Sequence, residues 1–375
     1  MKSIFFIFFI LVLTSDVSAQ VSREAAFHFN EAVLHFKEKN YESAVESYDK
    51  AIAAQPNYIK AHYNRAKVFL RLKKYDLAIK DLRKVIEDDD KNSKALMYIA
   101  YSYMQVKNYP AAISHYNRSL IIDPEQPEVY ANRGIAYMKE ERYEKASSDF
   151  AKSLSYDKSN AKIWLNQAVC QNKLGDENRA VACFRRMIEL DYKSEVAYLE
   201  IGKIYFNKKE FEKASETLKK LIAINPDHVE GRYLKGICHM KSEDFESASS
   251  ELANVLALDS AHDGAIQNLA YVSFKLKNYE LALDNFTTLL REKPDDANLR
   301  INRGIACIQL EKYEMAFDDF SRIIEHQPSM ATAYYNRASA AMGLQKSEQA
   351  CQDMRQAAKL GYEKAFDHIR SVCGQ

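Results

Sequence analysis

The chain has few of the residues that make tight turns. Ten glycines and seven prolines stand among 375 residues, where average usage would supply roughly 45 of the two together. Sandwiches, barrels and glycine-rich phosphate loops depend on such turns, so the composition argues against all three. Charge of one sign is also missing: 53 Lys and Arg stand against 52 Asp and Glu. That balance excludes the strongly basic signature of a nucleic-acid binder.

Cysteine is scarce, and the short motifs of catalysis are missing. Six cysteines in 375 residues are too few for a disulfide-dense scaffold. The sequence has no Gly-x-Ser-x-Gly, His-Glu-x-x-His, Walker or dinucleotide-binding motif, and its histidines do not cluster at metal-ligand spacing. We therefore predict a protein that is not an enzyme and has no cofactor and no metal site. With 47% apolar residues, the chain is nonetheless too apolar to be disordered.

Long apolar runs are missing except at the start of the chain. Ile4–Leu13 is an unbroken apolar run that follows Lys2 and precedes a small-residue cleavage site ending at Ala19, which is the pattern of a secretory signal peptide. Ten helical residues span about 15 Å, half of a hydrocarbon core of roughly 30 Å, so a membrane anchor is the weaker interpretation. We predict a signal peptide at 1–19, a lead at 20–24, and an exported mature chain, periplasmic or extracellular, without a transmembrane segment.

One alanine recurs every 34 residues through the rest of the chain. A small residue stands twelve places before each of these alanines. Each 34-residue frame holds two amphipathic stretches of about 14 residues with apolar positions at three- and four-residue steps, which predicts two helices. One pair of antiparallel helices cannot bury both of its faces, so neighbouring pairs must stack into a solenoid. The alanines are Ala44, Ala78, Ala112, Ala146, Ala180, Ala214, Ala248, Ala282, Ala316 and Ala350.

This pattern resembles the tetratricopeptide-repeat family. Within one frame, Tyr198, Gly202, Tyr205, Ala214 and Pro226 occupy the family's aromatic, glycine, tyrosine, alanine and proline places. The resemblance covers 25–364 and implies ten helix pairs in an all-α, right-handed superhelical solenoid. We expect the segment that follows, 365–375, to form a capping helix. It also implies a concave face lined by the first helix of each pair. The family's tryptophan is kept only at Trp164, and its place elsewhere holds residues such as His28, His62, Arg232 and Arg300.

A cation and an acid recur 16 residues apart within five of the frames. In an antiparallel helix pair these two places lie opposite each other, so we predict ion pairs that join the two helices, bidentate where the cation is arginine. The alternative, that these cations bind a ligand, is weaker because each already has an acidic partner. The pairs are Arg65 and Asp81, Arg133 and Asp149, Lys235 and Glu251, Arg303 and Asp319, and Arg337 and Asp353.

Asparagine recurs at one place of the first helix in seven frames. It is a poor helix former, but its amide offers donors and an acceptor that can hold one peptide unit of an extended chain. The series is similar to asparagine ladders known in some members of the family, which implies a peptide-binding groove. The alternative, that each amide bonds a neighbouring repeat, stays open. The residues are Asn30, Asn64, Asn132, Asn166, Asn268, Asn302 and Asn336.

Basic residues are expected on the same face, namely Lys60, Lys67, Arg71, Lys94 and Lys162. Some of the cations there lie near the end of a first helix, where they stabilise the helix dipole without any ligand. The others favour an acidic segment or a free C-terminal carboxylate as the ligand.

Two cysteines near the end of the chain differ from the others, which fall in helix interiors. Cys351 belongs to the last second helix and Cys373 to the C-terminal segment, so an oxidising compartment could join them if that segment folds back. The sequence leaves this pairing open.

The function predicted from these features is an exported, non-catalytic scaffold that binds peptide segments or partner proteins through its concave groove. The alternative is a structural subunit of an envelope secretion or polysaccharide-export assembly that docks through edges and convex faces. The partner is expected to be a protein or a peptide and not a nucleic acid. The sequence fixes neither its identity nor the oligomeric state.

Overall fold

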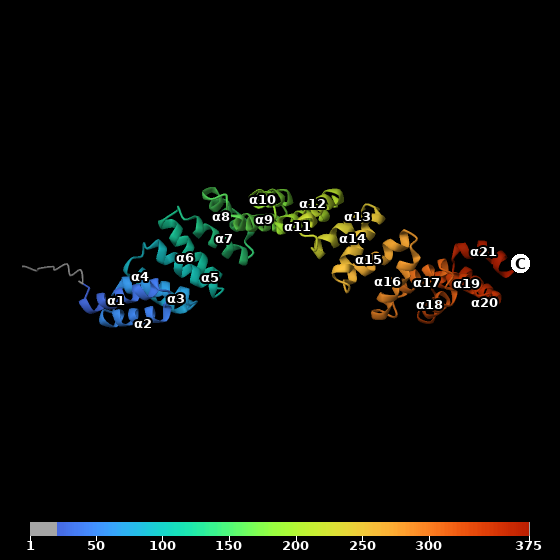
Figure 1. Ribbon diagram of the computed structural model, residues 1–375, viewed down its shortest axis with the longest axis horizontal. Helices are drawn as coiled ribbons and strands as arrows, with labels where there is room; N and C mark the ends of the chain where they lie inside the picture. The colour runs from blue at the N-terminus through green and yellow to red at the C-terminus, as the bar shows by residue number, and fades with distance from the viewer. Residues whose placement is uncertain (1–20, 375) are drawn as a thin grey trace, which may run out of the picture. The chain divides into compact units, whose positions relative to one another are not determined.

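The computed structural model describes residues 21–374 of the chain. The predicted signal peptide at 1–19 therefore lies outside the described residues. All regular secondary structure between residues 21 and 374 is helical (Figure 1). None of the helices in this range has both the length and the hydropathy that crossing a bilayer requires.

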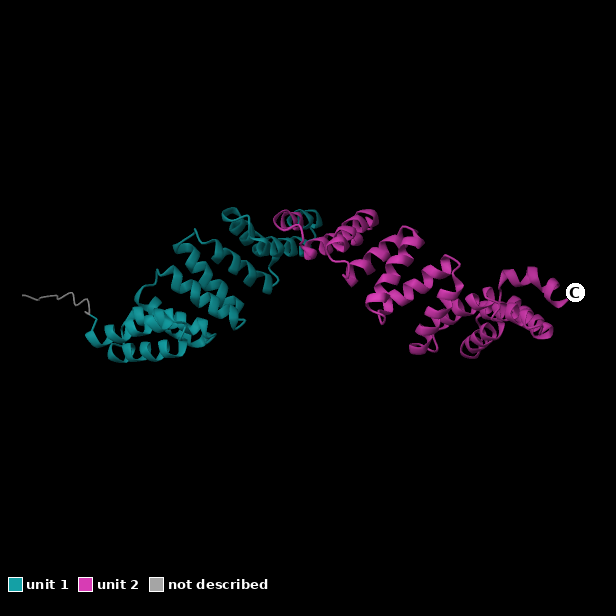
Figure 2. Cartoon of the chain, viewed as in Figure 1, with its two compact units in different colours: residues 1–183 teal, residues 184–375 magenta. Residues whose placement is uncertain are grey.

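The chain divides into two compact units, residues 1–183 and 184–375 (Figure 2). In unit 1 each helix packs against the next along the chain, and α5 and α7 also contact the next odd-numbered helix. Its helices are α1 (Arg23–Lys37), α2 (Tyr41–Ala54), α3 (Ile59–Arg71), α4 (Tyr75–Asp88), α5 (Ser93–Gln105), α6 (Tyr109–Ile122), α7 (Pro127–Lys139), α8 (Tyr143–Tyr156) and α9 (Ala161–Lys173). The division between the units falls within α10 (Glu177–Leu190).

Unit 2 repeats the same arrangement of neighbouring antiparallel pairs. Odd-numbered helices again contact the next odd-numbered helix at α11, α13 and α17. The helices are α11 (Glu195–Asn207), α12 (Phe211–Ile224), α13 (Val229–Lys241), α14 (Phe245–Leu258), α15 (Asp263–Lys275), α16 (Tyr279–Glu292), α17 (Ala297–Gln309), α18 (Tyr313–His326), α19 (Ala331–Gly343), α20 (Ser347–Lys359) and α21 (Glu363–Cys373). The all-α fold of stacked helix pairs predicted from the sequence is confirmed.

The recurring alanine and the small residue before it mark where two helices touch. Ala44 and Ala32 are both fully buried in one cluster between α1 and α2. Where the small residue is glycine, the fit is closer still. A Cβ added at Gly134 would lie 2.8 Å from the Phe150 ring, and one at Gly304 would lie 2.6 Å from the Phe320 ring. Small residues at this place therefore let a large side chain of the second helix fill the pair.

The turns inside the pairs explain the scarcity of glycine. Each turn needs one residue with positive φ after the odd-numbered helix, a place that usually holds glycine. Gly175 fills it in one frame, with φ 79°. In nine frames a long polar residue takes the left-handed conformation instead, with φ between 57° and 62°: Lys39, Lys73, Lys107, Glu141, Lys209, Glu243, Lys277, Glu311 and Gln345.

The last helix closes the stack of unit 2. α21 packs on α20, and Ala365 of α21 is fully buried in a cluster with Ala357 and Met354 of α20. A disulfide bond between Cys351 of α20 and Cys373 of α21 joins the two helices. The segment expected as a cap is thus a helix that covers the preceding pair.

Candidate functional site

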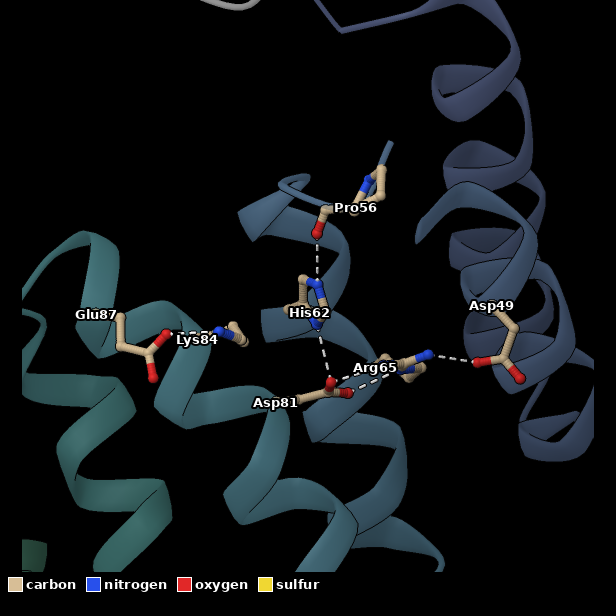
Figure 3. Close-up of polar contacts among 7 residues, drawn as sticks. All are labelled: Asp49, Pro56, His62, Arg65, Asp81, Lys84 and Glu87. Carbon is tan, nitrogen blue, oxygen red and sulfur yellow. Dashed lines mark hydrogen bonds and ion pairs between the residues drawn. The ribbon is translucent and has the colours of Figure 1, made fainter. Parts of the chain in front are cut away.

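The charged pairs expected within the frames lie between the two helices of each pair. Arg65 of α3 donates from Nε and Nη2 to the two carboxylate oxygens of Asp81 of α4, at 2.8 and 2.7 Å (Figure 3). Arg133 makes the same bidentate contact with Asp149, as do Arg303 with Asp319 and Arg337 with Asp353, at 2.6 to 2.8 Å. Lys235 Nζ donates to Glu251 at 2.7 Å. These cations are committed to partners within the chain.

A second donor, not foreseen from the sequence, supports these pairs. In four frames the residue at the family's tryptophan place donates a side-chain N–H to the backbone carbonyl six residues earlier. His62 and Arg232 contact the carbonyls of Pro56 and Pro226 in this way, at 3.0 and 2.6 Å, and Trp164 contacts that of Lys158. His62 and Arg232 also contact the carboxylates of Asp81 and Glu251 (Figure 3 shows the His62 cluster). The sequence did not predict these contacts, because the residues at this place are dissimilar and share only a side-chain N–H.

The cluster around Asp81 shifts the acidity of that carboxyl group. Burial opposes ionisation of Asp81, but hydrogen bonds from Arg65 and His62 outweigh it, so the pKa of Asp81 lies below its ordinary value. A charged, fully bonded carboxylate of this kind holds two helices together. The arrangement is structural, and it leaves the other polar residues of the odd-numbered helices to be explained.

Three hollows along the odd-numbered helices of unit 1 are lined by asparagines and basic residues that the sequence predicted for a peptide-binding groove. The first, of about 330 Å³, is lined by Lys60 and Asn64 of α3 and by Lys94 of α5. Phe29 of α1 and Tyr63 of α3 also line it and give it apolar walls.

The second hollow, of about 300 Å³, lies among α1, α3, α5 and α7. Lys67, Arg71 and Asn132 contribute its polar groups, and Tyr98 and Tyr101 are among its aromatic walls. The ammonium group of Lys67 lies 5.9 Å from the Phe36 ring centre and 5.8 Å from that of Tyr63, within cation–π range.

The third hollow, of about 460 Å³, lies among α7, α8 and α9 and is lined by Asn132, Lys162 and Asn166. Asn132 and Glu128 line both the second and the third hollow, so these two share a wall. We call the three hollows together the unit 1 groove. It contains every predicted groove residue of unit 1 except Asn30.

The asparagines and cations predicted for the unit 1 groove form no hydrogen bond or ion pair within the described chain. Across residues 21–374, the amides of Asn64, Asn132 and Asn166 make no hydrogen bond, and neither does that of the exposed Asn30. The same range gives no ion pair to the five basic residues Lys60, Lys67, Arg71, Lys94 and Lys162. These groups can therefore bind a ligand without breaking a hydrogen bond or an ion pair among residues 21–374.

The corresponding surface of unit 2 is partly occupied by its own side chains. Asn268 Nδ2 donates to the Tyr233 hydroxyl at 3.1 Å and to the Gly264 carbonyl at 2.7 Å. This is the alternative interpretation of the asparagine series, and it applies to this one position. Lys203 pairs with Glu200 at 3.2 Å and with Glu230 at 2.8 Å. Asn302 and Asn336 make no hydrogen bond within residues 21–374.

A polar hollow of about 600 Å³ in unit 2 is lined by a serine, a histidine and an aspartate whose side chains form a chain of polar contacts. Ser215 Oγ lies 3.3 Å from His239 Nε2, and His239 Nδ1 lies 3.1 Å from Asp244 Oδ2. The order is that of a hydrolase triad, but Ser215 stands inside α12, where backbone N–H groups are committed to the helix and form no oxyanion hole. Gln171 donates to Ser147 across the same 24-residue offset at 2.8 Å. The contact therefore belongs to the packing of successive helix pairs.

The remaining reactive residues give no sign of chemistry. Burial raises the pKa of the Cys170, Cys183 and Cys307 thiols to about 11 and that of Cys238 to about 12, which keeps them protonated and unreactive. Between residues 21 and 374, no cluster of three metal-ligating side chains occurs.

Comparison with known proteins identifies the fold. Models described as "TPR repeat" and "Tetratricopeptide repeat" match residues 34–73, 63–127 and 331–360. A model of the C-terminal ARM domain of tetratricopeptide repeat protein 21 matches residues 123–306. The chain belongs to the tetratricopeptide-repeat family. Its fold is consistent with a protein–protein interaction scaffold, and the family is generally non-catalytic.

Several solved structures are similar to this chain. The C-terminal part of a TPR repeat-containing protein from Cytophaga hutchinsonii aligns with a TM-score of 0.58 and 21% identity, over 64% of this chain and 99% of that one. A tetratricopeptide repeat protein from Parabacteroides merdae aligns with a TM-score of 0.46 and 18% identity, over 67% and 99%. YrrB, described as a TPR protein with an unusual peptide-binding site, aligns with a TM-score of 0.44 and 21% identity, over 50% and 96%. No curated protein matches the chain.

Proposed function

We propose that the unit 1 groove binds an extended peptide segment that carries an acidic group, a side-chain carboxylate or a free C-terminus. One observation carries the proposal. The cations that join paired helices are bonded to acids of the chain, whereas within residues 21–374 the predicted cations and amides of the groove form no ion pair or hydrogen bond. Unbonded polar groups that converge in a hollow with aromatic walls are the usual make-up of a binding site.

The asparagines supply main-chain recognition. Asn132 of α7 and Asn166 of α9 stand at the same repeat place and line one hollow. Adjacent helices lie about 8–10 Å apart, close to three residues of extended chain at about 3.3 Å each. Each amide can donate to a peptide carbonyl and accept from a peptide N–H. The groove therefore binds extended backbone with little dependence on the ligand's sequence.

The second hollow supplies the preference for an acid. Lys67 and Arg71 stand one helical turn apart on α3, and both line a hollow walled by Phe36, Tyr98 and Tyr101. An apolar side chain of the ligand fits the aromatic walls, and a neighbouring carboxylate pairs with the two cations. Glu128 at the far wall disfavours a second carboxylate there, so the acid is directed to the α3 side.

Peptide binding by the intact chain tests this function. Fluorescence anisotropy with a set of 12-residue acidic peptides, each made with a free and with an amidated C-terminus, gives the affinity. The triple variant Asn64→Ala, Asn132→Ala, Asn166→Ala is expected to lower affinity at least tenfold, because three amide contacts are lost. The double variant Asn302→Ala, Asn336→Ala is the matched control, since it removes unbonded amides at the same repeat place in unit 2.

The charge preference has its own variant. Lys67→Glu with Arg71→Glu is expected to abolish binding of acidic peptides and to lower the thermal midpoint only slightly, because within residues 21–374 neither cation forms an ion pair and Lys67 has only its ring contacts with Phe36 and Tyr63 to lose. Unchanged peptide affinity in both the triple asparagine variant and the Lys67→Glu, Arg71→Glu variant would refute the groove. Equal loss in the unit 2 control would refute its restriction to unit 1.

We further propose that the protein is exported. The support is the signal-peptide pattern at 1–19 and the disulfide between Cys351 and Cys373, since such bonds persist in oxidising compartments. Mass spectrometry of the non-reduced protein from cell fractions tests both points. The proposal would be contradicted if the protein in the cytoplasmic fraction still carried residues 1–19 and had free thiols at Cys351 and Cys373.

A second candidate function is a structural subunit of an envelope secretion or polysaccharide-export assembly that docks through its edges. The observation that favours it is the exposure of Phe27 and Leu34 on α1, the first helix of the stack. Affinity capture of large assemblies that survives the Asn64, Asn132 and Asn166 substitutions would support this role over the groove.

A further inference from the structure

The first helix of the stack exposes two large apolar side chains. Phe27 is 65% exposed and Leu34 is 58% exposed. At the same place as Leu34, every later odd-numbered helix of the repeats buries its residue: Val68, Ser102, Ala136, Cys170, Ile204, Cys238, Val272, Ala306 and Ala340. The place of Phe27 is likewise buried at Ala61, Ala95, Val129, Ile163, Ala197, Gly231, Ala265 and Ala333.

These places are buried because the preceding helix pair covers them. Ala61 and Val68 of α3 pack in one cluster with Tyr48 and Ala51 of α2. Within residues 21–374 no helix precedes α1, so Phe27 and Leu34 point to where such a pair would lie. Terminal repeats of a solenoid normally present a polar outer face. In unit 2, α21 covers the last helix pair.

Charged residues flank the two apolar side chains symmetrically. Arg23 stands four residues before Phe27, and Glu38 stands four residues after Leu34. At about 100° per residue, Arg23 and Glu38 lie within about 40° of Phe27 around the helix axis. Both are exposed, and Glu38 has one distant contact, to His35 at 3.9 Å. Along one face, α1 therefore presents a cation, two apolar side chains and an anion.

We propose that this face binds a second copy of the chain, with the two α1 helices antiparallel about a two-fold axis. The midpoint between Phe27 and Leu34 is also the midpoint between Arg23 and Glu38. When Phe27 packs on Leu34 of the second copy, Arg23 therefore faces Glu38 of that copy, and each contact occurs twice. Glu31, which lies near the axis, already accepts hydrogen bonds from His28 and Ser47 of its own chain.

The contact is a reversible one. A single pair of crossed helices buries less than the roughly 1,200 Å² of a standard stable interface. The dimer is therefore expected to form at micromolar or higher concentration and to dissociate on dilution. It leaves the unit 1 groove, whose hollows lie on α3 to α9 and the inner side of α1, available for ligand.

Charge exchange between two variants tests the arrangement. In sedimentation velocity of the full chain over a concentration series, Arg23→Glu and Glu38→Arg are each expected to raise the dimer Kd at least tenfold, because each places like charges opposite each other twice. An equimolar mixture of the two variants is expected to regain the wild-type Kd, since the first carries only acids and the second only bases at these places. Glu46→Arg, an exposed charge on α2, is the control.

Three outcomes would overturn the proposal. The wild-type chain remains monomeric at all concentrations. The mixture of variants stays monomeric, as it would if the dimer used another surface. Phe27→Asp leaves the wild-type Kd unchanged. All the changed side chains are exposed, and circular dichroism checks that each variant is folded.

Discussion

Removing the carboxylate of Asp319 is expected to destabilise one helix pair far more than removing an exposed acid. The Asp319 side chain is 1% exposed and accepts hydrogen bonds from two arginines. Arg303 contributes two of them, at 2.8 and 2.6 Å, and Arg300 contributes one at 2.8 Å. Asp319→Ala leaves both arginines, whose side chains are 10% and 15% exposed, without this counter-charge.

The size of this effect follows from burial. Breaking a buried ion pair by removing one partner costs about 3–5 kcal/mol, because an uncompensated charge stays inside. Asp295 is the matched control: its side chain is 61% exposed and lies 3.4 Å from Arg322. Exposed pairs contribute about 0–1 kcal/mol. The expected ratio between the two substitutions is therefore at least threefold in free energy.

Native-state hydrogen exchange is the appropriate assay. The stability of a solenoid is a sum of repeat and neighbour contributions, so a global midpoint under-reports a local change. Protection of α17 and α18 amides is expected to fall at least a hundredfold in Asp319→Ala and less than tenfold in Asp295→Ala. Equal loss in the two variants would refute the reasoning.

A triple variant tests the cause. Replacing a buried ion cluster by apolar residues of similar size is often neutral or stabilising, so Arg300→Leu, Arg303→Met and Asp319→Leu together are expected to recover most of the lost protection. If protection does not recover in the triple variant, the loss in Asp319→Ala is not explained by the two unpaired buried charges alone.

Three further predictions concern other parts of the fold. The pKa of Asp81 is lowered on folding, so the stability that its carboxylate contributes is complete above its unfolded pKa of about 3.9 and is lost as the pH falls through the folded pKa. The difference in unfolding free energy between wild type and Asp81→Asn, measured by urea titration, is therefore expected to shrink below pH 4. Gly304→Ala is expected to cost about 1–3 kcal/mol because its Cβ meets the Phe320 ring at 2.6 Å, and Phe320→Leu in the same chain should recover part of that loss in thermal unfolding. Reduction of the bond between Cys351 and Cys373, which closes a loop of 22 residues, is expected to cost about 3 kcal/mol, seen as faster exchange in α20 and α21.

The sequence predicted the fold because one period dominates it. A 34-residue recurrence of Ala, preceded by a small residue, specifies both the helix pair and the stacking of pairs. The opposed charges of Arg65 and Asp81 could be placed for the same reason, since an antiparallel pair fixes which residues face each other. The contacts of His62 and Arg232 with proline carbonyls could not, because two dissimilar side chains share only an N–H at one point in space.

The asparagine series shows the limit of a pattern read along one chain. Asn132 and Asn268 occupy the same repeat place, so the sequence gives no ground for separating them. The structure separates them by a residue on a neighbouring helix, because the Tyr233 hydroxyl reaches Asn268 and that amide also bonds its own helix at Gly264. A repeat position therefore fixes where a side chain lies, and its neighbours decide whether it is free to bind a ligand.

The charged residues also divide into those that pair within the chain and those that do not, although the net charge is near zero. Arg65 and Arg133 stand opposite acids sixteen residues away, and Lys203 in unit 2 lies between Glu200 and Glu230. Lys67 and Arg71 in the unit 1 groove share a hollow with Glu128, but within residues 21–374 neither forms an ion pair. Fully paired charges make a fold consistent at every level, and departures from that consistency are expected at functional sites. The unpaired cations of the groove are such a departure, so an acid supplied by the ligand completes a pairing that elsewhere the chain makes with its own side chains.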